Sequence, residues 1–256
     1  MTNDTTETPR AALITGAGRR IGRAIALGLA REGYAVLLHA NRSRADAENV
    51  AAEINGAGGH ARVVLADLAD REALNGLVPA AKVFGSLTLL VNSASVFEQD
   101  EIGTLDRDNF ERAMAVNLTA PLFLAKAFAA QAPDAADASI INIVDQRVLK
   151  PTPLFFSYAL SKAALHDATT MLAQALAPKV RVNAVAPGPT LPSPRQSQEQ
   201  FAAQAATVPL GRGPGPDDIA AAVLYLAKAQ SVTGVTIAVD GGQHLAWRTP
   251  DSEVAE

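Results

Sequence analysis

The sequence predicts an α/β protein in which a parallel sheet carries helices on both faces. Two observations support this class. Short apolar segments alternate with longer amphipathic segments from one end of the chain to the other, as in repeated strand–helix units. The longer segments are also rich in alanine, which favours helix and allows close packing.

The elements follow one another in a regular order. The expected strands are Ala11–Thr15, Ala35–His39, Arg62–Leu65, Leu87–Asn92, Ile140–Val144, Arg181–Ala186 and Thr236–Val239. The expected main helices are Ile21–Glu32, Ala45–Ile54, Arg71–Phe84, Asn109–Ala130, Tyr158–Ala177 and Asp217–Ala227. One domain is expected over residues 10–246, between a flexible tail at 1–9 and an acidic tail at 247–256. Residues 187–215, rich in Pro, Ser, Gln and Gly, predict a mobile substrate loop with a short helix at Gln196–Ala206.

Composition excludes several classes of function. The 256 residues are 48% hydrophobic and 19% charged, which suits one large domain, and the net charge of −4 argues against a nucleic-acid surface. No unbroken apolar run approaches the ~18–20 residues of a membrane span. Cysteine is absent, and the four histidines lack zinc-site spacing, so we expect neither thiol chemistry nor a metal. A cytoplasmic protein acting on a small molecule is the expectation.

A glycine-rich turn follows the first strand. Thr15 is followed by Gly16, Gly18, Arg19, Arg20, Ile21 and Gly22, and the segment leads into a helix. Glycines at such a turn let main-chain N–H groups approach a pyrophosphate at the start of the helix. The spacing Gly-x-Gly-x-x-x-Gly differs from the usual dinucleotide fingerprint, so a purely structural turn is the alternative interpretation.

The end of the second strand indicates which nucleotide binds. Enzymes that use NAD commonly place an acid there for the ribose 2′-hydroxyl, whereas this chain has Arg42 and Ser43. With Arg19 and Arg20 they can hold a 2′-phosphate, which favours NADPH as the cofactor. After the third strand, Asp67 is a candidate acceptor for the adenine amino group, or alternatively the cap of the next helix.

A second group of residues has the composition of a proton-transfer site. Tyr158 and Lys162 are four residues apart and share one face of a predicted helix. The ammonium is expected to lower the phenol pKa, which makes Tyr158 a usable proton donor. Asp145 lies thirteen residues before Tyr158.

Taken in order, these motifs resemble the short-chain dehydrogenase/reductase family over nearly the whole chain. They are completed by Asn92-Ser93-Ala94-Ser95, Asn117 and Pro187-Gly188. The resemblance implies a single doubly wound Rossmann domain with a seven-stranded parallel sheet, and a homotetramer. It implies that Tyr158 donates the proton, that Lys162 binds the nicotinamide ribose, and that Asn117 holds a relay water. The cofactor contacts that it implies include His39, Leu68, Asn92, Ser93, Ala94, Lys162, Pro187, Gly188 and Thr190, in addition to those above.

Three departures from the family pattern occur together. Arg20, Ser95 and Asp145 stand where the family usually has Gly, Gly and Ser, and they are similar to the pteridine reductase and dihydromonapterin reductase branch. His39 to Ser43 and Phe97 match the same branch. The resemblance implies a pterin substrate in contact with Arg20, Ser95, Phe97, Asp145 and Tyr158.

The residue types suit a flat heterocycle. Phe97 can stack on a pterin opposite the nicotinamide, although a core or interface role is the alternative. Arg20 can reach both the cofactor phosphates and the pterin edge, or the phosphates alone. Asp145 can bond the tyrosine hydroxyl or a ring N–H, and it disfavours ketone reduction because like charges repel. Alternatively, it only pairs with Arg147 or a main-chain amide.

The sequence therefore leaves three candidate functions. The first is an NADPH-dependent reductase of pterin ring imines. The second is a reductase of a ketone or a 3-oxoacyl substrate, which would favour Ser at position 145. The third is a dinucleotide-binding sensor without turnover, which the presence of Tyr158 and Lys162 disfavours.

Overall fold

The computed structural model describes residues 10–133 and 137–247, so the two predicted tails lie outside the described residues except for Trp247. Within the described residues, one all-parallel sheet has the strand order β3-β2-β1-β4-β5-β6-β7. The strands are β1 (Ala11–Ile14), β2 (Ala35–Ala40), β3 (Ala61–Leu65), β4 (Leu87–Asn92), β5 (Ala138–Ile143), β6 (Val180–Pro187) and β7 (Thr236–Val239). The predicted fold class is confirmed.

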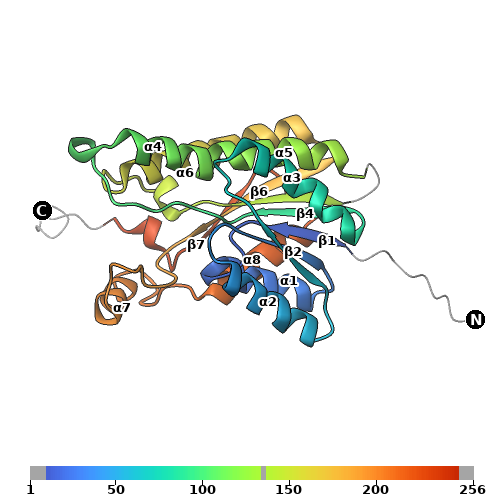
Figure 1. Ribbon diagram of the computed structural model, residues 1–256. Helices are drawn as coiled ribbons and strands as arrows, with labels where there is room; N and C mark the ends of the chain where they lie inside the picture. The colour runs from blue at the N-terminus through green and yellow to red at the C-terminus, as the bar shows by residue number, and fades with distance from the viewer. Residues whose placement is uncertain (1–9, 134–136, 248–256) are drawn as a thin grey trace, which may run out of the picture.

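The helices cover both faces of this sheet (Figure 1). They are α1 (Arg20–Arg31), α2 (Arg44–Gly56), α3 (Arg71–Ala80), α4 (Arg107–Met114), α5 (Ala120–Gln131), α6 (Phe156–Leu176), α7 (Gln198–Ala206) and α8 (Pro216–Lys228). Helices α1, α2 and α8 lie on one face, and α3 to α6 lie on the other. Helix α7 belongs to the loop after β6 and lies away from the sheet.

The central strands are apolar on both sides because each side meets a helix layer. Along β1, Ala12 and Ile14 pack into the core shared with α1 and α8, whereas Ala11 and Leu13 pack into the core shared with α3 and α5. All four residues are fully buried. This alternation fixes the register of β1 and therefore the position of the turn that follows it.

Strand order reverses between β1 and β4, since β1 pairs with β2 on one side and with β4 on the other. The loops that leave β1 and β4 therefore diverge to opposite faces and leave a crevice at the carboxyl edge of the sheet. In open α/β sheets ligands bind at this switch point.

The helix predicted over Asn109–Ala130 is interrupted. Helix α4 ends at Met114, a π-helical turn occupies Ala115–Thr119, and α5 follows. Pro121 explains part of the break, because it has no N–H to donate to the carbonyl of Asn117. The other predicted elements are present with small shifts of their ends, and Arg71–Phe84 finishes as a 3-10 turn after Ala80.

The run Arg107–Gln131 is long and apolar enough to cross a membrane by length and composition, with a mean hydropathy of 1.4 over its most apolar window. The expectation from the sequence that no segment has the length and apolar composition of a membrane span is therefore wrong. In the structure the run packs on the sheet, with Ala120, Leu124 and Phe128 buried in the core beside β4 and β5. Core packing therefore accounts for part of its apolar composition, since 44% of that window is buried.

Candidate active site

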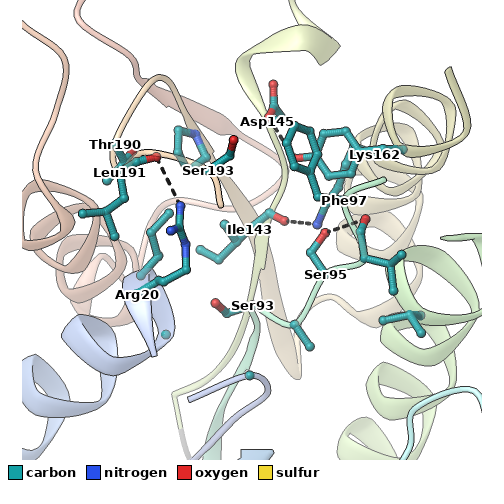
Figure 2. A pocket seen from close by; sticks show the side chains of 18 of the residues that line it. Arg20, Ser93, Ser95, Phe97, Ile143, Asp145, Lys162, Thr190, Leu191 and Ser193 are labelled. Carbon is teal, nitrogen blue, oxygen red and sulfur yellow. Dashed lines mark hydrogen bonds between the residues drawn. The ribbon is translucent and has the colours of Figure 1, made fainter. Parts of the chain in front are cut away.

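Most of the predicted site residues line one cavity of about 1150 Å³ at the carboxyl edge of the sheet (Figure 2). They are Gly16, Arg19, Arg20, Ile21, Gly22, His39, Arg42, Ser43, Asp67, Leu68, Ser93, Ala94, Ser95, Phe97, Asp145, Tyr158, Lys162, Pro187, Gly188 and Thr190. Three predicted residues, Gly18, Asn92 and Asn117, do not line it. Segments from six separate strand ends thus converge on one space.

The glycine turn exposes main chain to this cavity. Gly16 has a φ of 68°, and a Cβ there would lie 2.9 Å from the Cα of Ala94; a Cβ on Gly22 would lie 2.2 Å from the carbonyl oxygen of Gly16. Gly18 has a different role, because a Cβ there would meet the main-chain nitrogen of Ala47 in α2 at 3.0 Å.

The start of α1 has spare donors. Arg19 is its N-cap, yet among the described residues no side chain caps the first turn, and the turn contains no acid. The early N–H groups of a helix need acceptors, and an anionic phosphate is a suitable one. This feature and the glycine turn fit a dinucleotide pyrophosphate, while Arg42 and Ser43 line the cavity beyond β2, where a 2′-phosphate would bind.

His39 supports the turn from behind. The main-chain N–H of Gly16 donates to its Nδ1 at 3.2 Å, so the ring proton is assigned to Nε2, which donates to the carbonyl of Ala66 at 3.0 Å. Burial lowers the pKa of His39, which keeps the imidazole neutral. The ring therefore joins the ends of β1, β2 and β3.

Asn92 and Asp67 have structural partners that the sequence did not indicate. The Asn92 amide donates to Asn142 at 2.8 Å and joins the ends of β4 and β5, away from the cavity. Asp67 lines the cavity and forms an ion pair of 2.9 Å with Arg112, which lowers the pKa of Asp67. The predicted alternative for Asp67 is wrong, since Asp70 caps α3 by accepting from Glu72 and Ala73.

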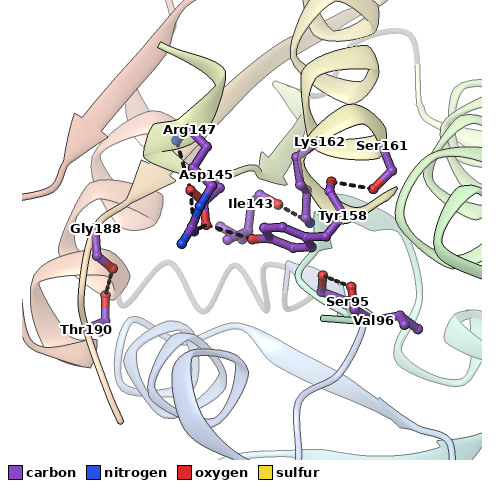
Figure 3. A network of polar contacts seen from close by, with 10 residues as sticks. All are labelled: Ser95, Val96, Ile143, Asp145, Arg147, Tyr158, Ser161, Lys162, Gly188 and Thr190. Atoms are coloured by element: carbon purple, nitrogen blue, oxygen red, sulfur yellow. Dashed lines mark hydrogen bonds and ion pairs between the residues drawn. The ribbon is translucent and has the colours of Figure 1, made fainter. Parts of the chain in front are cut away.

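Asp145, Tyr158 and Lys162 meet at the centre of the site (Figure 3). The Tyr158 hydroxyl donates to Oδ2 of Asp145 at 2.8 Å, which is one of the contacts that the sequence left open for this carboxylate. Lys162 lies one helical turn further along α6, is 2% exposed, and donates from Nζ to the carbonyl of Ile143 at 2.7 Å. Helix α6 and the end of β5 thereby fix the three side chains in one place.

The electrostatics differ from the expectation. Burial raises the pKa of Tyr158 well above its usual value, and the charge of Asp145 and the hydrogen bond to it raise it further. The predicted lowering by Lys162 is not the dominant effect: its Nζ lies 6.0 Å from the centre of the phenol ring, and the ammonium donates to a carbonyl instead. Burial lowers the pKa of Lys162 to about 8. Tyr158 therefore keeps its proton at neutral pH.

An aromatic wall, formed by Phe97, Phe155 and Tyr158, borders this centre. The rings of Phe97 and Phe155 stack with centroids 4.4 Å apart and an angle of 11°, and Tyr158 meets Phe97 edge-on at 4.7 Å. Phe155, just before α6, has a φ of 56°, which is a strained backbone conformation for a bulky residue. Strained conformations of this kind occur most often at functional sites. Phe97 thus lies in the site, and one of its faces is already covered.

Sequence reasoning missed two residues of this region as site residues, Phe155 and Arg147. Arg147 donates to Asp145, and its guanidinium lies 5.3 Å from the Phe155 ring centre and 5.8 Å from that of Phe97. A signal existed for Phe155, because Phe155-Phe156 immediately precedes the Tyr158 motif. Arg147 had been considered only as a competing partner for Asp145.

Asn117 is buried behind the wall and its side chain is saturated. Its Oδ1 accepts from the main chain of Val96 at 2.8 Å and from Ser95 at 3.2 Å, and its Nδ2 donates to Val96 and Ser161, each at 3.0 Å. No capacity remains in the side chain for the predicted relay water. The main-chain carbonyl is the other candidate, because Pro121 cannot act as its α-helical donor.

The loop after β6 closes one side of the cavity. Arg20 donates to the carbonyls of Leu191 and Pro192 at 3.2 and 2.8 Å, so in this structure it binds the loop (Figure 2). Arg195 donates to Glu98 at 3.0 Å and to the carbonyl of Phe97 at 2.9 Å. Two arginines therefore hold the loop across the site from opposite sides.

Comparisons with known proteins agree with this geometry. The family model described as enoyl-(acyl carrier protein) reductase matches residues 16–244. The crystal structure of FolM alternative dihydrofolate reductase 1 from Brucella suis in complex with NADP is 49% identical with a TM-score of 0.91, over 94% of this chain and 98% of that one. Pteridine reductase 1 from Leishmania tarentolae is 34% identical over 94% of this chain and 98% of its own length. Galactitol 2-dehydrogenase from Agrobacterium fabrum is also 34% identical, over 93% and 98%.

Proposed function

Because the chain belongs to the short-chain dehydrogenase/reductase family, we propose that it is an NADPH-dependent reductase that transfers hydride to a ring imine of a pterin. The similarity to FolM alternative dihydrofolate reductase 1 and to pteridine reductase 1 supports this substrate class. The observation that carries the proposal is the 2.8 Å hydrogen bond from Tyr158 to the Asp145 carboxylate beside the aromatic wall.

The cofactor site belongs to the glycine turn and the ends of β1, β2 and β4. Main-chain N–H groups after Gly16 would hold the pyrophosphate, and Arg42 and Ser43 would hold the 2′-phosphate. Bound NADPH supplies the hydride that reduces the ring carbon. The chain's own residues orient the substrate and manage the proton.

Tyr158 supplies the proton to the ring nitrogen. Its raised pKa keeps the hydroxyl protonated over the physiological pH range, so Tyr158 carries the proton that it donates. Loss of that proton beside Asp145 would place two anions together, so the proton must be replaced promptly. Lys162, with a pKa of about 8, is the buried group that can exchange a proton near neutral pH.

The charge of Asp145 selects the substrate. A carboxylate destabilises the alkoxide that develops when a ketone is reduced, because the two negative charges repel. The same carboxylate stabilises a protonated ring imine, which is a cation and a better hydride acceptor than the neutral form. Asp145 therefore favours reduction of C=N over reduction of C=O.

The test is NADPH oxidation on addition of 7,8-dihydrobiopterin, followed at the nicotinamide absorbance band. We expect turnover by the native protein and none by Tyr158→Phe, which removes the donor and leaves the cofactor site intact. Native protein that binds NADPH but leaves dihydrobiopterin unreduced would refute the proposal.

Reduction of a ketone is the second candidate function. The similarity to galactitol 2-dehydrogenase, at the same identity as pteridine reductase 1, favours it. A sensor without turnover is disfavoured, because Tyr158 and Lys162 are both in place and Tyr158 is bonded to Asp145. Parallel assays with a simple diketone distinguish the two enzymes.

We also propose that the protein is a homotetramer. Helices α5 and α6 expose large apolar side chains to solvent, among them Phe123, Leu160 and Met171 with exposed fractions of 51%, 43% and 67%. Leu245 and Trp247, 62% and 71% exposed, mark a second apolar region near the end of the described chain. Such surfaces are typical of subunit contacts.

A further inference from the structure

Arg147 makes the densest set of contacts with the Asp145 carboxylate. Its main-chain N–H donates to Oδ1 at 2.8 Å, and its Nη1 donates to Oδ1 at 3.2 Å and to Oδ2 at 3.1 Å. The Tyr158 hydroxyl is the other donor to Oδ2. One residue therefore contacts both carboxylate oxygens and leaves Oδ2 directed at the tyrosine (Figure 3).

The rest of the Arg147 side chain is fixed by aromatic contacts. Its guanidinium lies over the rings of both Phe97 and Phe155, at 5.8 and 5.3 Å from their centres. The side chains of Arg147 and Asp145 are only 21% and 14% exposed, so solvent screens the pair weakly. The guanidinium is thus fixed between the aromatic wall and the carboxylate.

The other charged groups near Asp145 do not take this role. Lys162 faces the pair from α6, but its ammonium donates to the carbonyl of Ile143. Arg195 approaches Phe97 from the loop after β6 at 5.7 Å and pairs with Glu98 instead. Arg20 approaches from α1 and bonds the loop carbonyls. Among the described residues, Arg147 is the cation that forms an ion pair with Asp145.

We propose that Arg147 is a positioning residue that holds the Asp145 carboxylate in place and aims its Oδ2 at the Tyr158 hydroxyl. A guanidinium suits this task because it stays charged at every working pH and its planar fork matches a carboxylate. It acts through Asp145, since it contacts neither the tyrosine hydroxyl nor the lysine ammonium in the hydrogen-bond network. The inference rests on the proposed function for its kinetic readout only.

The alternative is a purely structural role. Asp145 caps the 3-10 turn Gln146–Val148 by accepting from the main chain of Arg147, and this contact survives any substitution of the side chain. A structural role would lower stability when the side chain is removed, but it would leave the hydrogen bond from Tyr158 to Asp145 intact. The state of that hydrogen bond therefore separates the two roles.

Three variants test the proposal. Arg147→Met keeps the length and removes the charge, Arg147→Lys keeps the charge and removes the planar fork, and Arg195→Met removes a guanidinium over Phe97 without touching Asp145. Two quantities are measured in each at neutral pH: the ¹³C chemical shift of the Tyr158 Cζ, assigned with Tyr158→Phe, which reports the hydrogen bond to Asp145, and kcat/KM for 7,8-dihydrobiopterin.

If the guanidinium aims Oδ2, its removal weakens the hydrogen bond from Tyr158, so in Arg147→Met the Tyr158 signal should move toward its position in Asp145→Ala, and kcat/KM should fall about tenfold or more. Arg147→Lys should restore part of both, because an ammonium keeps the charge but lacks the planar fork. Arg195→Met should leave both quantities at their native values.

Equal Tyr158 signals in the native protein and in Arg147→Met would overturn the proposal. If Arg147→Met does not fold, Arg147→Lys decides, since a Tyr158 signal and a kcat/KM equal to the native values would contradict a role for the planar fork. Absence of pterin turnover in the native protein would refute the proposed function alone, because the Tyr158 signal needs no substrate.

Discussion

Replacement of Asp145 by serine separates the two reductions that the site can support. In the structure the carboxylate accepts a hydrogen bond from the Tyr158 hydroxyl at 2.8 Å and forms an ion pair with Arg147 at 3.1 Å. Serine is shorter and neutral, so both contacts are lost. The hydroxyl that replaces them is a donor, which suits a developing alkoxide and not a protonated imine.

The size of the effect follows from these contacts. A hydrogen bond to a charged group contributes about 1.5–3 kcal/mol, and leaving the partly buried guanidinium of Arg147 without its partner costs about 1 kcal/mol more. Since 1.4 kcal/mol is about a factor of ten in rate, the expected loss of pterin turnover is on the order of 10²–10⁴-fold, as for loss of a general acid/base component. Loss of the carboxylate also removes two of the causes that raise the pKa of Tyr158.

The assay is kcat/KM for 7,8-dihydrobiopterin and for a simple diketone, with NADPH, in native protein and Asp145→Ser. We expect the pterin value to fall and any diketone value to rise. Tyr158→Phe is the control, because it should lose both activities while still binding NADPH. Unchanged pterin reduction in Asp145→Ser would show that the carboxylate takes no part in the chemistry.

Three further predictions concern the cofactor, stability and assembly. Arg42→Ala should raise KM for NADPH about tenfold or more and leave KM for NADH nearly unchanged, since only NADPH carries the 2′-phosphate; equal kcat/KM for the two cofactors in native protein would contradict this. Burial lowers the pKa of Lys162 from 10.5 to about 8, so its charged form destabilises the fold below about pH 8, and the cost is relieved as pH rises toward 10.5. Lys162→Met should therefore abolish turnover yet raise Tm at pH 7, by a margin that narrows above pH 8, and a lowered Tm at pH 7 would count against it. Light scattering at micromolar concentration should give the mass of a tetramer, and a monomer would refute the assembly.

The architecture was predictable because it depends on local patterns. Each strand is a short apolar segment and each helix an amphipathic one, and the carboxyl ends of parallel strands necessarily meet at one edge. The glycine turn and the Tyr158–Lys162 pair were found because their spacing reflects direct geometric requirements. The break at Ala115–Thr119 was missed, since the apolar pattern continues through it and Pro121 alone does not specify a π-helical turn.

The electrostatics of the site were less predictable. Spacing places Lys162 on the same face as Tyr158, but it does not show that the ammonium donates to Ile143 or that Asp145 bonds the phenol. These contacts depend on the end of β5 meeting α6, residues far apart in the sequence. The predicted sign of the Tyr158 pKa shift was wrong for this reason.

Hydrogen-bond partners that lie far apart in the sequence were also not predictable. The family resemblance implied that Asn117 holds a relay water; its side chain is saturated by Ser95, Val96 and Ser161, which leaves its main-chain carbonyl as the candidate. Arg20 was predicted to meet phosphate or pterin, and it binds the loop at Leu191 and Pro192, about 170 residues away in the chain. No local pattern encodes such contacts.

The most direct test of the account compares C=N with C=O reduction in the native protein. With NADPH saturating, kcat/KM is measured for 7,8-dihydrobiopterin and for a simple diketone in the same preparation, with Tyr158→Phe as the blank. The position of Asp145 against Tyr158 predicts that the pterin is reduced and that the diketone is reduced far more slowly. A diketone value equal to or above the pterin value would contradict the claim that the carboxylate selects a ring imine.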